Sequence, residues 1–485
     1  MPINSFLYPG AKFIPTYEVA NSCMFNVGDD AKLTRTAPNS SATHDDKFTF
    51  SCWIKRAVLG ARQQIYSTFD GGGAPYQEFQ FYFKDDDTLR IQTYNSSNQM
   101  ELIPNRLFRD VSSWYHFVFA YDSSQGTASN RAKLYVNGTQ ETSFATETYP
   151  SQNVDGEFAI QNHIQAIGNN TANNRDSGLY LAEVVGVDGQ ALAQTQFGEF
   201  DEDSPTIWKP KDVSGINVGT LGFYLDFEDS SALGNDVSGV GDFTATNLAA
   251  TDQATDTCTN NFCTMNPLYA ATSSAFTFAQ GNCELTQNDT NWRTSAGTMG
   301  VSSGKWYFEA KGGQGTNGYT HYGWASTSWL NEKGDGSMNE PSTNHNGPCV
   351  TYYGANGNNY YSTSSATGSN GSYGATWDND HTIGCFLDLD NNKAYWSKDG
   401  TLQNSGTGYS IESGFTWLPI VGGYDMDNGG ESVKVNFGGC PATTISSGNT
   451  DGEYGNFEYT TTITGDGSSK TFKALCTKNL AEYGG

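Results

Sequence analysis

The stretch that decides the fold is residues 382–400, which reads TIGCFLDLDNNKAYWSKDG. From Ile383 to Leu389 every second side chain is apolar, the period of a β-strand with one buried face. The run stops at an Asp-Asn-Asn sequence that favours a tight turn, and residues 393–397 read back as a second strand. This hairpin predicts antiparallel sheet.

The composition extends this prediction to the whole chain. A length of 485 residues exceeds one ordinary core and predicts two domains of roughly 200 residues each. Gly, Ser, Thr and Asn are abundant, aromatic residues make up 13%, and no long stretch places apolar residues at helical spacing. The composition therefore predicts an all-β protein.

The charge balance excludes one class of partner. With 26 basic against 52 acidic residues, the formal net charge is −26, which repels a phosphate backbone. We expect no nucleic-acid partner. The first residues, MPINSFLYPGAKF, lack the basic start and apolar core of a secretory signal, and no segment reaches membrane-spanning length. We expect synthesis in the cytoplasm without a signal peptide, and no membrane insertion.

The cysteines give no framework for a disulfide-rich or metal-bound fold. Nine cysteines are scattered, and Cys52 and Cys385 lie on strand patterns where a small thiol packs. Cys258 and Cys263 lie in a segment without strand periodicity, and their pairing stays open. No His/Cys grouping has zinc spacing.

Four motifs in the first half follow a familiar order: FTFSCWIKR (48–56), WYHFVFAYD (114–122), AKLYVNG (132–138) and LYLAEVVGVDG (179–189). This order resembles the laminin-G and pentraxin-like branch of the concanavalin A-like jelly rolls. The resemblance implies two antiparallel sheets packed face to face.

A second resemblance covers the second half. GKWYFEAK (304–311), HYGWAS (321–326), the 382–400 hairpin and VKVNFGG (433–439) resemble the SPRY or B30.2 domain, a bent β-sandwich that is a binding module in its relatives. We therefore divide the chain into a docking arm (1–20), a first sandwich (21–229), a Gly/Asp/Thr/Asn-rich linker along the surface (230–270), a SPRY-like sandwich (271–445) and a C-terminal extension with a short strand (446–485).

Several sequence motifs typical of catalytic or cofactor sites occur here without the secondary structure that these sites require. Residues 313–318 fit GxGxxG but continue as a strand, and residues 300–304 fit GxSxG but lead into a strand. Asp388, Asp390 and Asn392 have the opening spacing of a calcium loop, yet the hairpin explains them. We expect no catalytic residue, no metal site and no cofactor; calcium in the first sandwich stays open.

Binding remains. Aromatic faces stack on sugar rings, and amide and carboxylate groups exchange hydrogen bonds with hydroxyls. Two polar segments have this composition, residues 162–176 and the long Gly/Asn/Ser/Tyr stretch 344–371, which we expect to be a loop. The candidate carbohydrate-binding residues are Asn162, Asn169, Asn170, Asn174, Asp176, Trp329, Tyr352, Tyr353, Asn356, Asn359, Tyr360, Tyr361 and Trp377.

The pairing of the two sandwiches resembles virion appendage proteins of tailed bacteriophages. The resemblance implies a tail fibre, tail adhesin or head fibre on the virion surface that contacts other virion proteins and host-surface polysaccharide as a homo-oligomer, with a trimer favoured. Two alternatives stay open. One is a capsid decoration or assembly protein, and the other is a glycan-degrading hydrolase whose fold brings together carboxylates such as Glu183 and Glu309.

Overall fold

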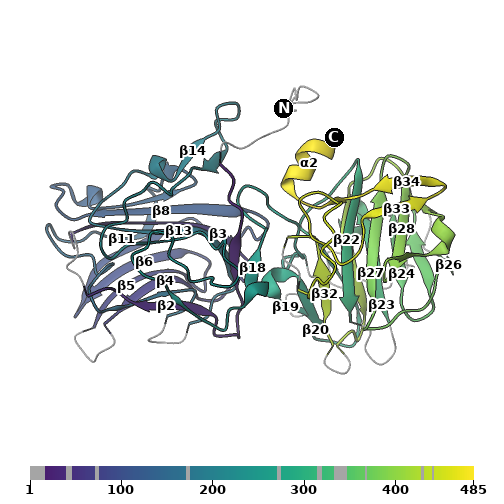
Figure 1. The fold of residues 1–485 in the computed structure, drawn as a ribbon, viewed down its shortest axis with the longest axis horizontal. Coiled ribbons are helices and arrows are strands. Elements are labelled where there is room, and N and C mark those ends of the chain that lie inside the picture. The colour runs from purple at the N-terminus through teal and green to yellow at the C-terminus, as the bar shows by residue number, and fades with distance from the viewer. Residues whose placement is uncertain are drawn as a thin grey trace.

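The computed structural model describes residues 17–39, 46–70, 76–170, 175–269, 275–313, 319–331, 347–365, 369–427, 431–439 and 442–484. Figure 1 shows two β-sandwiches side by side, with the earlier half of the chain in purple to teal and the later half in green to yellow. The prediction of an all-β chain with two antiparallel sandwiches is confirmed.

One layer of the first sandwich has the strand order β10-β9-β8-β3-β13-β1-β18, and β16 also pairs with β13. Every pairing in it is antiparallel. Its strands are β1 (Ser22–Phe25), β3 (Lys47–Arg56), β8 (Trp114–Asp122), β9 (Ala132–Val136), β10 (Thr139–Gln140), β13 (Leu179–Asp188), β16 (Phe223–Leu225) and β18 (Gln253–Ala254).

The facing layer has the order β11-β7-β6-β5-β4-β12-β2-β17. Phe50 and Phe119 from the first layer meet Phe81 and Ile91 from this one in a single buried core. Its strands are β2 (Lys32–Thr36), β4 (Gln63–Phe69), β5 (Gln77–Phe83), β6 (Leu89–Asn95), β7 (Asn98–Pro104), β11 (Phe144–Thr148), β12 (Ile164–Ile167) and β17 (Thr244–Thr246).

The second sandwich pairs the order β19-β20-β32-β22-β27-β28-β29 with the order β21-β31-β23-β24-β25-β26; β30 adds to β28 and β35 to β22. Its strands are β19 (Phe276–Ala279), β20 (Glu284–Gln287), β21 (Trp292–Ala296), β22 (Lys305–Gly312), β23 (Thr320–Ser326), β24 (Cys349–Tyr353), β25 (Asn358–Ser362), β26 (Ser369–Ser372), β27 (Thr382–Asp388), β28 (Lys393–Lys398), β29 (Thr401–Leu402), β30 (Tyr409–Ser410), β31 (Trp417–Tyr424), β32 (Val433–Asn436) and β35 (Lys473–Ala474).

The predicted hairpin is confirmed as β27 and β28, which pair from Ile383 with Lys398 to Asp388 with Lys393. Cys385 and Leu387 point into the core, as the alternation requires. Asn392 ends the turn at a φ of 52°, a left-handed conformation that Asn tolerates better than most residues.

Short elements complete the fold. They are the hairpins β14 (Gly198–Phe200) with β15 (Trp208–Pro210) and β33 (Thr462–Gly465) with β34 (Ser468–Thr471), the helices α1 (Thr327–Asn331) and α2 (Thr477–Tyr483), and five 3-10 turns at 128–130, 194–196, 250–252, 280–282 and 404–406. The β33–β34 hairpin confirms the strand signal expected near the C-terminus. Within the described residues, no helix is both long and apolar enough to cross a lipid bilayer.

The segment expected to be a surface linker, residues 230–270, is mostly exposed or half-buried in its described part, but two short stretches of it pair with the first sandwich. β17 pairs with β2, and β18 pairs with β1, so the segment adds a strand to each layer of the first sandwich. Phe243 and Met265 are buried as well. This pairing was not predicted, because composition alone does not reveal edge strands.

This connecting segment holds the two sandwiches together through a buried ion pair. The Lys55 Nζ on β3 lies 2.7 Å from the Asp256 carboxylate, and both side chains are almost fully buried. Lys55 also donates to Asn261 Oδ1 at 2.8 Å and to the Phe262 carbonyl at 2.9 Å, while Trp114 Nε1 donates to Asp256 at 3.1 Å. Each charge therefore has several hydrogen-bond partners, which a buried ion pair requires to be stable.

The two sandwiches also touch directly. The Tyr180 hydroxyl donates to the Gly281 carbonyl at 2.9 Å, and a Cβ atom at position 281 would lie 1.8 Å from the Tyr180 hydroxyl oxygen. Gly281 also has a φ of 60°. Glycine is required there by both the backbone and the close approach of the two halves.

Cys258 and Cys263 are both free thiols, so these two do not pair. Cys52 and Cys385 are completely buried. This confirms the prediction that these two thiols pack as small apolar groups.

We predict that Asp256→Ala will lower the free energy of unfolding by about 3 to 5 kcal/mol, because it leaves the buried Lys55 charge without its counter-ion. Urea denaturation measures the change. Lys84→Ala, which breaks the half-exposed pair Lys84–Asp86, should cost under about 1 kcal/mol. Equal losses in the two variants would contradict the role of the buried pair.

Candidate functional site

A groove opens on the outer face of the first sandwich, over β5 and β6. The register of these strands sets Phe79 and Phe81 toward the core and their sequence neighbours toward solvent. Glu78 pairs with Tyr94, and Gln80 pairs with Gln92, directly across the two strands. Cross-strand partners have side chains about 5 Å apart on one face. The alternation that builds the core therefore also assembles a polar surface.

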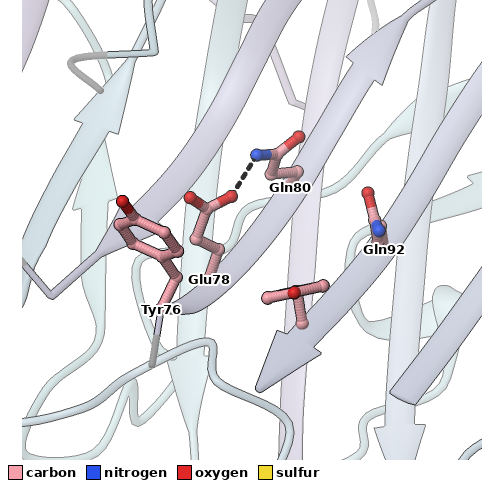
Figure 2. Close-up of a pocket in the computed structure, with 5 residues that line it drawn as sticks. Tyr76, Glu78, Gln80 and Gln92 are labelled. Carbon is pink, nitrogen blue, oxygen red and sulfur yellow. Dashed lines mark hydrogen bonds between the residues drawn. The ribbon is translucent and has the colours of Figure 1, made fainter. Parts of the chain in front are cut away.

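The groove has a volume of about 210 Å³ and is lined by Tyr76, Glu78, Gln80, Gln92 and Tyr94. Figure 2 shows Tyr76 next to the Glu78 carboxylate, with Gln80 donating a hydrogen bond to that carboxylate and Gln92 on the neighbouring strand. Tyr76 is 43% exposed. Two phenol rings, two amides and one carboxylate thus face a single open space.

Glu78 is electrostatically the most distinctive member of the groove. Burial raises the pKa of the Glu78 carboxyl group, and the Gln80 hydrogen bond and the charge of Arg62 oppose this rise. A partly desolvated carboxylate is a strong hydrogen-bond acceptor for hydroxyl groups. The groove can therefore orient a polar, ring-containing ligand.

The residues predicted in stretch 344–371 lie elsewhere than expected. The prediction of a loop is wrong for its described part, which forms β24, β25 and the start of β26. Tyr352 is fully buried in the core of the second sandwich, and Trp377 stacks on Tyr322 with ring centres 4.7 Å apart. Trp329 on α1 is also fully buried. These three rings cannot present a face to a sugar.

The other predicted residues of this stretch are partly accessible at best. Tyr353 stacks on His321 with ring centres 4.3 Å apart, and Tyr360 is 5.0 Å from Tyr353. Tyr361 is half-buried against Tyr409. Asn359 is buried and Asn356 is exposed, where it donates to the Tyr360 hydroxyl at 3.2 Å. Strand pairing and ring contacts bring several of these residues near one another, but the two grooves found in the described part of the chain are lined by other residues.

The residues predicted at 162–176 divide between surface and interior. Asn162 is exposed, whereas Asn169 and Asn170 are buried. Asn169 donates to Asp176 at 3.0 Å and to Asp30 at 3.3 Å. Burial raises the pKa of Asp176, and the neighbouring Asp30 raises it further. These contacts brace the chain, and Asn174 lies outside the described residues.

The carboxylates considered for hydrolysis lie in different sandwiches. Glu309 on β22 accepts from the backbone N–H groups of Tyr459 and Glu458 at 2.8 and 3.0 Å, and burial raises its pKa. Glu183 on β13 accepts from the hydroxyls of Tyr224 at 2.9 Å and Tyr17 at 3.1 Å. Each is buried and hydrogen-bonded within its own half.

Glu183 stands at an irregularity in β13, where the register with β3 shifts between Ala182 and Val185. Its φ is 49°, a costly conformation for a residue other than glycine. Burial raises its pKa to about 7, against the two tyrosine hydrogen bonds. The side chain anchors Tyr17, so it holds the end of the arm on the first sandwich.

No group of three or more His, Cys, Asp or Glu side chains that could hold a metal ion occurs in the described part of the chain. The groove residues were not predicted from the sequence. Their signal is the set of polar residues that alternate with the apolar ones in EFQFYF (78–83) and LRIQTYN (89–95), which lie on strands and not in the polar segments where the sequence predicted binding.

We predict that wild-type stability will fall relative to Glu183→Gln as the pH rises from 5 to 8. The folded-state pKa of about 7 lies above the ordinary value of 4.5, so the protonated side chain favours folding at low pH, and this contribution is lost as Glu183 ionises. The difference amounts to about 3 kcal/mol. Urea denaturation at several pH values measures it. The exposed-site variant Glu202→Gln should follow the wild type, and a Glu183→Gln curve parallel to the wild type would contradict the prediction.

The family comparisons divide the chain in the same order as the two sandwiches. Residues 28–183 match the model of the concanavalin A-like lectin/glucanases superfamily. Residues 305–440 match the model of the SPRY domain. A comparison with curated protein sequences finds no match. The first family description includes both lectins and glucanases, so it does not separate binding from hydrolysis.

Solved structures with similar folds have low identity. The SPRY domain of human HERC1 is 17% identical and covers 37% of this chain and 99% of its own, with a TM-score of 0.28. The heptameric SAP-like pentraxin of Limulus polyphemus is 17% identical and covers 37% and 81%, with a TM-score of 0.27. Domains LG4-5 of the mouse laminin alpha1 chain are 10% identical and cover 87% and 86%, with a TM-score of 0.29.

The family matches and the two layered sandwiches agree on the order of the parts. This chain carries a concanavalin A-like domain followed by a SPRY domain.

Proposed function

We propose that this chain is a non-enzymatic glycan-binding protein, and that the groove between Tyr76 and Tyr94 is its binding site. The observation that supports the proposal is the lining of the groove: two phenol rings beside two amides and a carboxylate. Aromatic faces stack on the apolar faces of sugar rings, and amide and carboxylate groups exchange hydrogen bonds with hydroxyls. The site lies on strands, so its residues are held by the sheet.

The lining favours binding over hydrolysis. Glycoside hydrolysis ordinarily uses two carboxyl groups on opposite sides of the scissile bond. Among the residues that line the groove, Glu78 is the one carboxylate. Glu183 and Glu309, the candidates for a hydrolytic pair, are buried in separate halves, and neither lines the groove.

We place this binding protein on the surface of a tailed-phage particle, as a tail fibre, tail adhesin or head fibre made in the host cytoplasm. The order of the two sandwiches supports this setting through its resemblance to virion appendage proteins. A shallow groove binds one glycan weakly, so several copies would be needed for firm attachment to host polysaccharide. A symmetric homo-oligomer, with a trimer favoured, supplies those copies.

We predict that Tyr76→Ala will weaken glycan binding at least tenfold, a loss of about 1.4 kcal/mol, because it removes the most exposed stacking ring. A glycan array followed by calorimetry on the strongest ligand measures the change. Tyr454→Ala removes a tyrosine of similar exposure, 40%, from the C-terminal extension and should bind like the wild type. Equal binding by all three proteins, or reducing-end release from the bound glycan, would overturn the proposal.

A second candidate function, capsid decoration or assembly, is favoured by one surface feature. On the β14–β15 hairpin, at the upper edge of the first sandwich in Figure 1, Phe200 is 43% and Ile207 is 55% exposed. Large exposed apolar side chains on a projecting hairpin are typical of a protein contact. Glu199 and Asp201 flank them, and Lys209 lies 3.7 and 3.3 Å from these carboxylates.

For this candidate, we predict that the double variant Phe200→Ser, Ile207→Ser will lose incorporation into particles while it keeps glycan binding. Electron microscopy and immunoblotting of purified particles measure incorporation. Val237→Ser, at a separate exposed apolar residue, serves as the control. Normal incorporation of the double variant would remove the hairpin as the contact.

A further inference from the structure

A cation lies next to the groove, in contact with Gln80, which is one of the lining residues. Arg62, which precedes β4, donates from Nη2 to Gln80 Oε1 at 2.8 Å, and its guanidinium carbon is 3.8 Å from the centre of the Tyr82 ring. Tyr82 pairs with Arg90 across β5 and β6. The row that begins with Glu78 and Tyr94 therefore continues through the glutamines to two arginines on the same face.

Gln80 connects Glu78 to Arg62. Its Nε2 donates to the Glu78 carboxylate, and its Oε1 accepts from Arg62. Both polar atoms of this amide are thereby fixed, so its orientation is defined. A ligand in the groove faces a carboxylate and two phenol rings, and the Arg62 guanidinium lies one hydrogen bond beyond, on the far side of Gln80.

Arg62 differs from most arginines of the chain in its lack of a counter-ion. Arg90 is 2.6 Å from Glu101, and Arg131 donates to three backbone carbonyls. Within the described residues Arg62 has no ion pair, and its Nε is buried without a hydrogen-bond partner. Arg175 is exposed and likewise has no ion pair among them. A partly buried charge without a counter-ion is unfavourable.

The charges around Arg62 also favour an anionic partner. Burial lowers the pKa of the Arg62 guanidinium, and the charges of Arg175 and Arg90 lower it further, while Tyr82 and Glu78 oppose this. Two more arginines thus act on Arg62 in a chain whose formal net charge is −26. A local excess of positive charge on such an acidic protein marks a place where an anion gains most from binding.

We propose that the ligand of the groove is an anionic glycan, whose carboxylate or sulfate group pairs with Arg62 while an adjoining sugar ring lies against Tyr76 and Tyr94. This inference rests on the proposed function and specifies its ligand class. Arginine suits the role because its planar fork can donate two parallel hydrogen bonds to such a group. Gln80 acts as a positioning residue that holds Arg62 toward the groove.

The test uses the full chain in calorimetry with three probes: oligogalacturonate for carboxylate, sulfated dextran oligomers for sulfate, and neutral dextran oligomers. We expect one anionic probe to bind at least tenfold more tightly than the neutral probe. Arg62→Gln should lose at least tenfold for that anion and much less for the neutral probe, whereas Arg62→Lys should retain part of the affinity for the anion. The anion whose affinity depends on Arg62 identifies the substituent.

Lys133→Gln is the matched control, because it removes one positive charge from β9 in the other layer of the sandwich. It should bind every probe like the wild type, and thermal unfolding of each variant should match the wild type. Loss of anion binding in Lys133→Gln as large as in Arg62→Gln would mean a general charge effect and overturn the inference.

The failures of the inference and of the proposed function are distinguishable. Neutral and anionic probes that bind equally, with the affinity still lost in Tyr76→Ala, would overturn the anionic ligand and leave the groove as a glycan site. An array and three probes that all fail to bind would overturn both. Anion binding that survives Arg62→Gln would assign the anion to another cation and overturn the inference.

Discussion

The buried pair of Lys55 and Asp256 is the interaction on which the joint between the two halves depends. Lys55 stands on β3, near the middle of one layer of the first sandwich, and Asp256 belongs to the connecting segment. The same ammonium group binds Asn261 and the Phe262 carbonyl, and Phe262 forms a bridge with Cys476 near the end of the chain. The Lys55 ammonium group therefore links the first sandwich to the connecting segment, which in turn pairs with the C-terminal extension.

The fold could be predicted from the sequence because alternation of apolar residues is a local property. Ile383 to Leu389, Phe79 to Phe83 and the aromatic strand at 114–122 each show the two-residue period without reference to the rest of the chain. The connecting segment shows no such period. β17 and β18 are very short, and their pairing depends on the edges of β2 and β1, which lie more than 200 residues earlier. Such pairing cannot be recognised from composition.

The candidate site could be predicted only in its chemistry. Tyrosines and amides, the predicted residue types, also line the groove, but Tyr352 and Trp377 themselves are buried because their polar surroundings form strands and a second core. In the groove the informative residues are the polar members of the same strands whose apolar members predicted the core. Knowledge of the register, Glu78 opposite Tyr94 and Gln80 opposite Gln92, was needed to see them as one surface.

The last residues of the chain complete the second sandwich. Glu309 in β22 binds the backbone of Glu458 and Tyr459, and β35 pairs with the same strand in parallel. The connecting segment in turn meets residues 475 to 477. During synthesis, the first sandwich can therefore form on the ribosome, whereas the second half and the joint must wait until the final turn of α2 has left the exit tunnel. A chain truncated before that point will expose the edge of β22 and the contact surface between the connecting segment and residues 475–477. Such exposed edges favour aggregation and proteolysis.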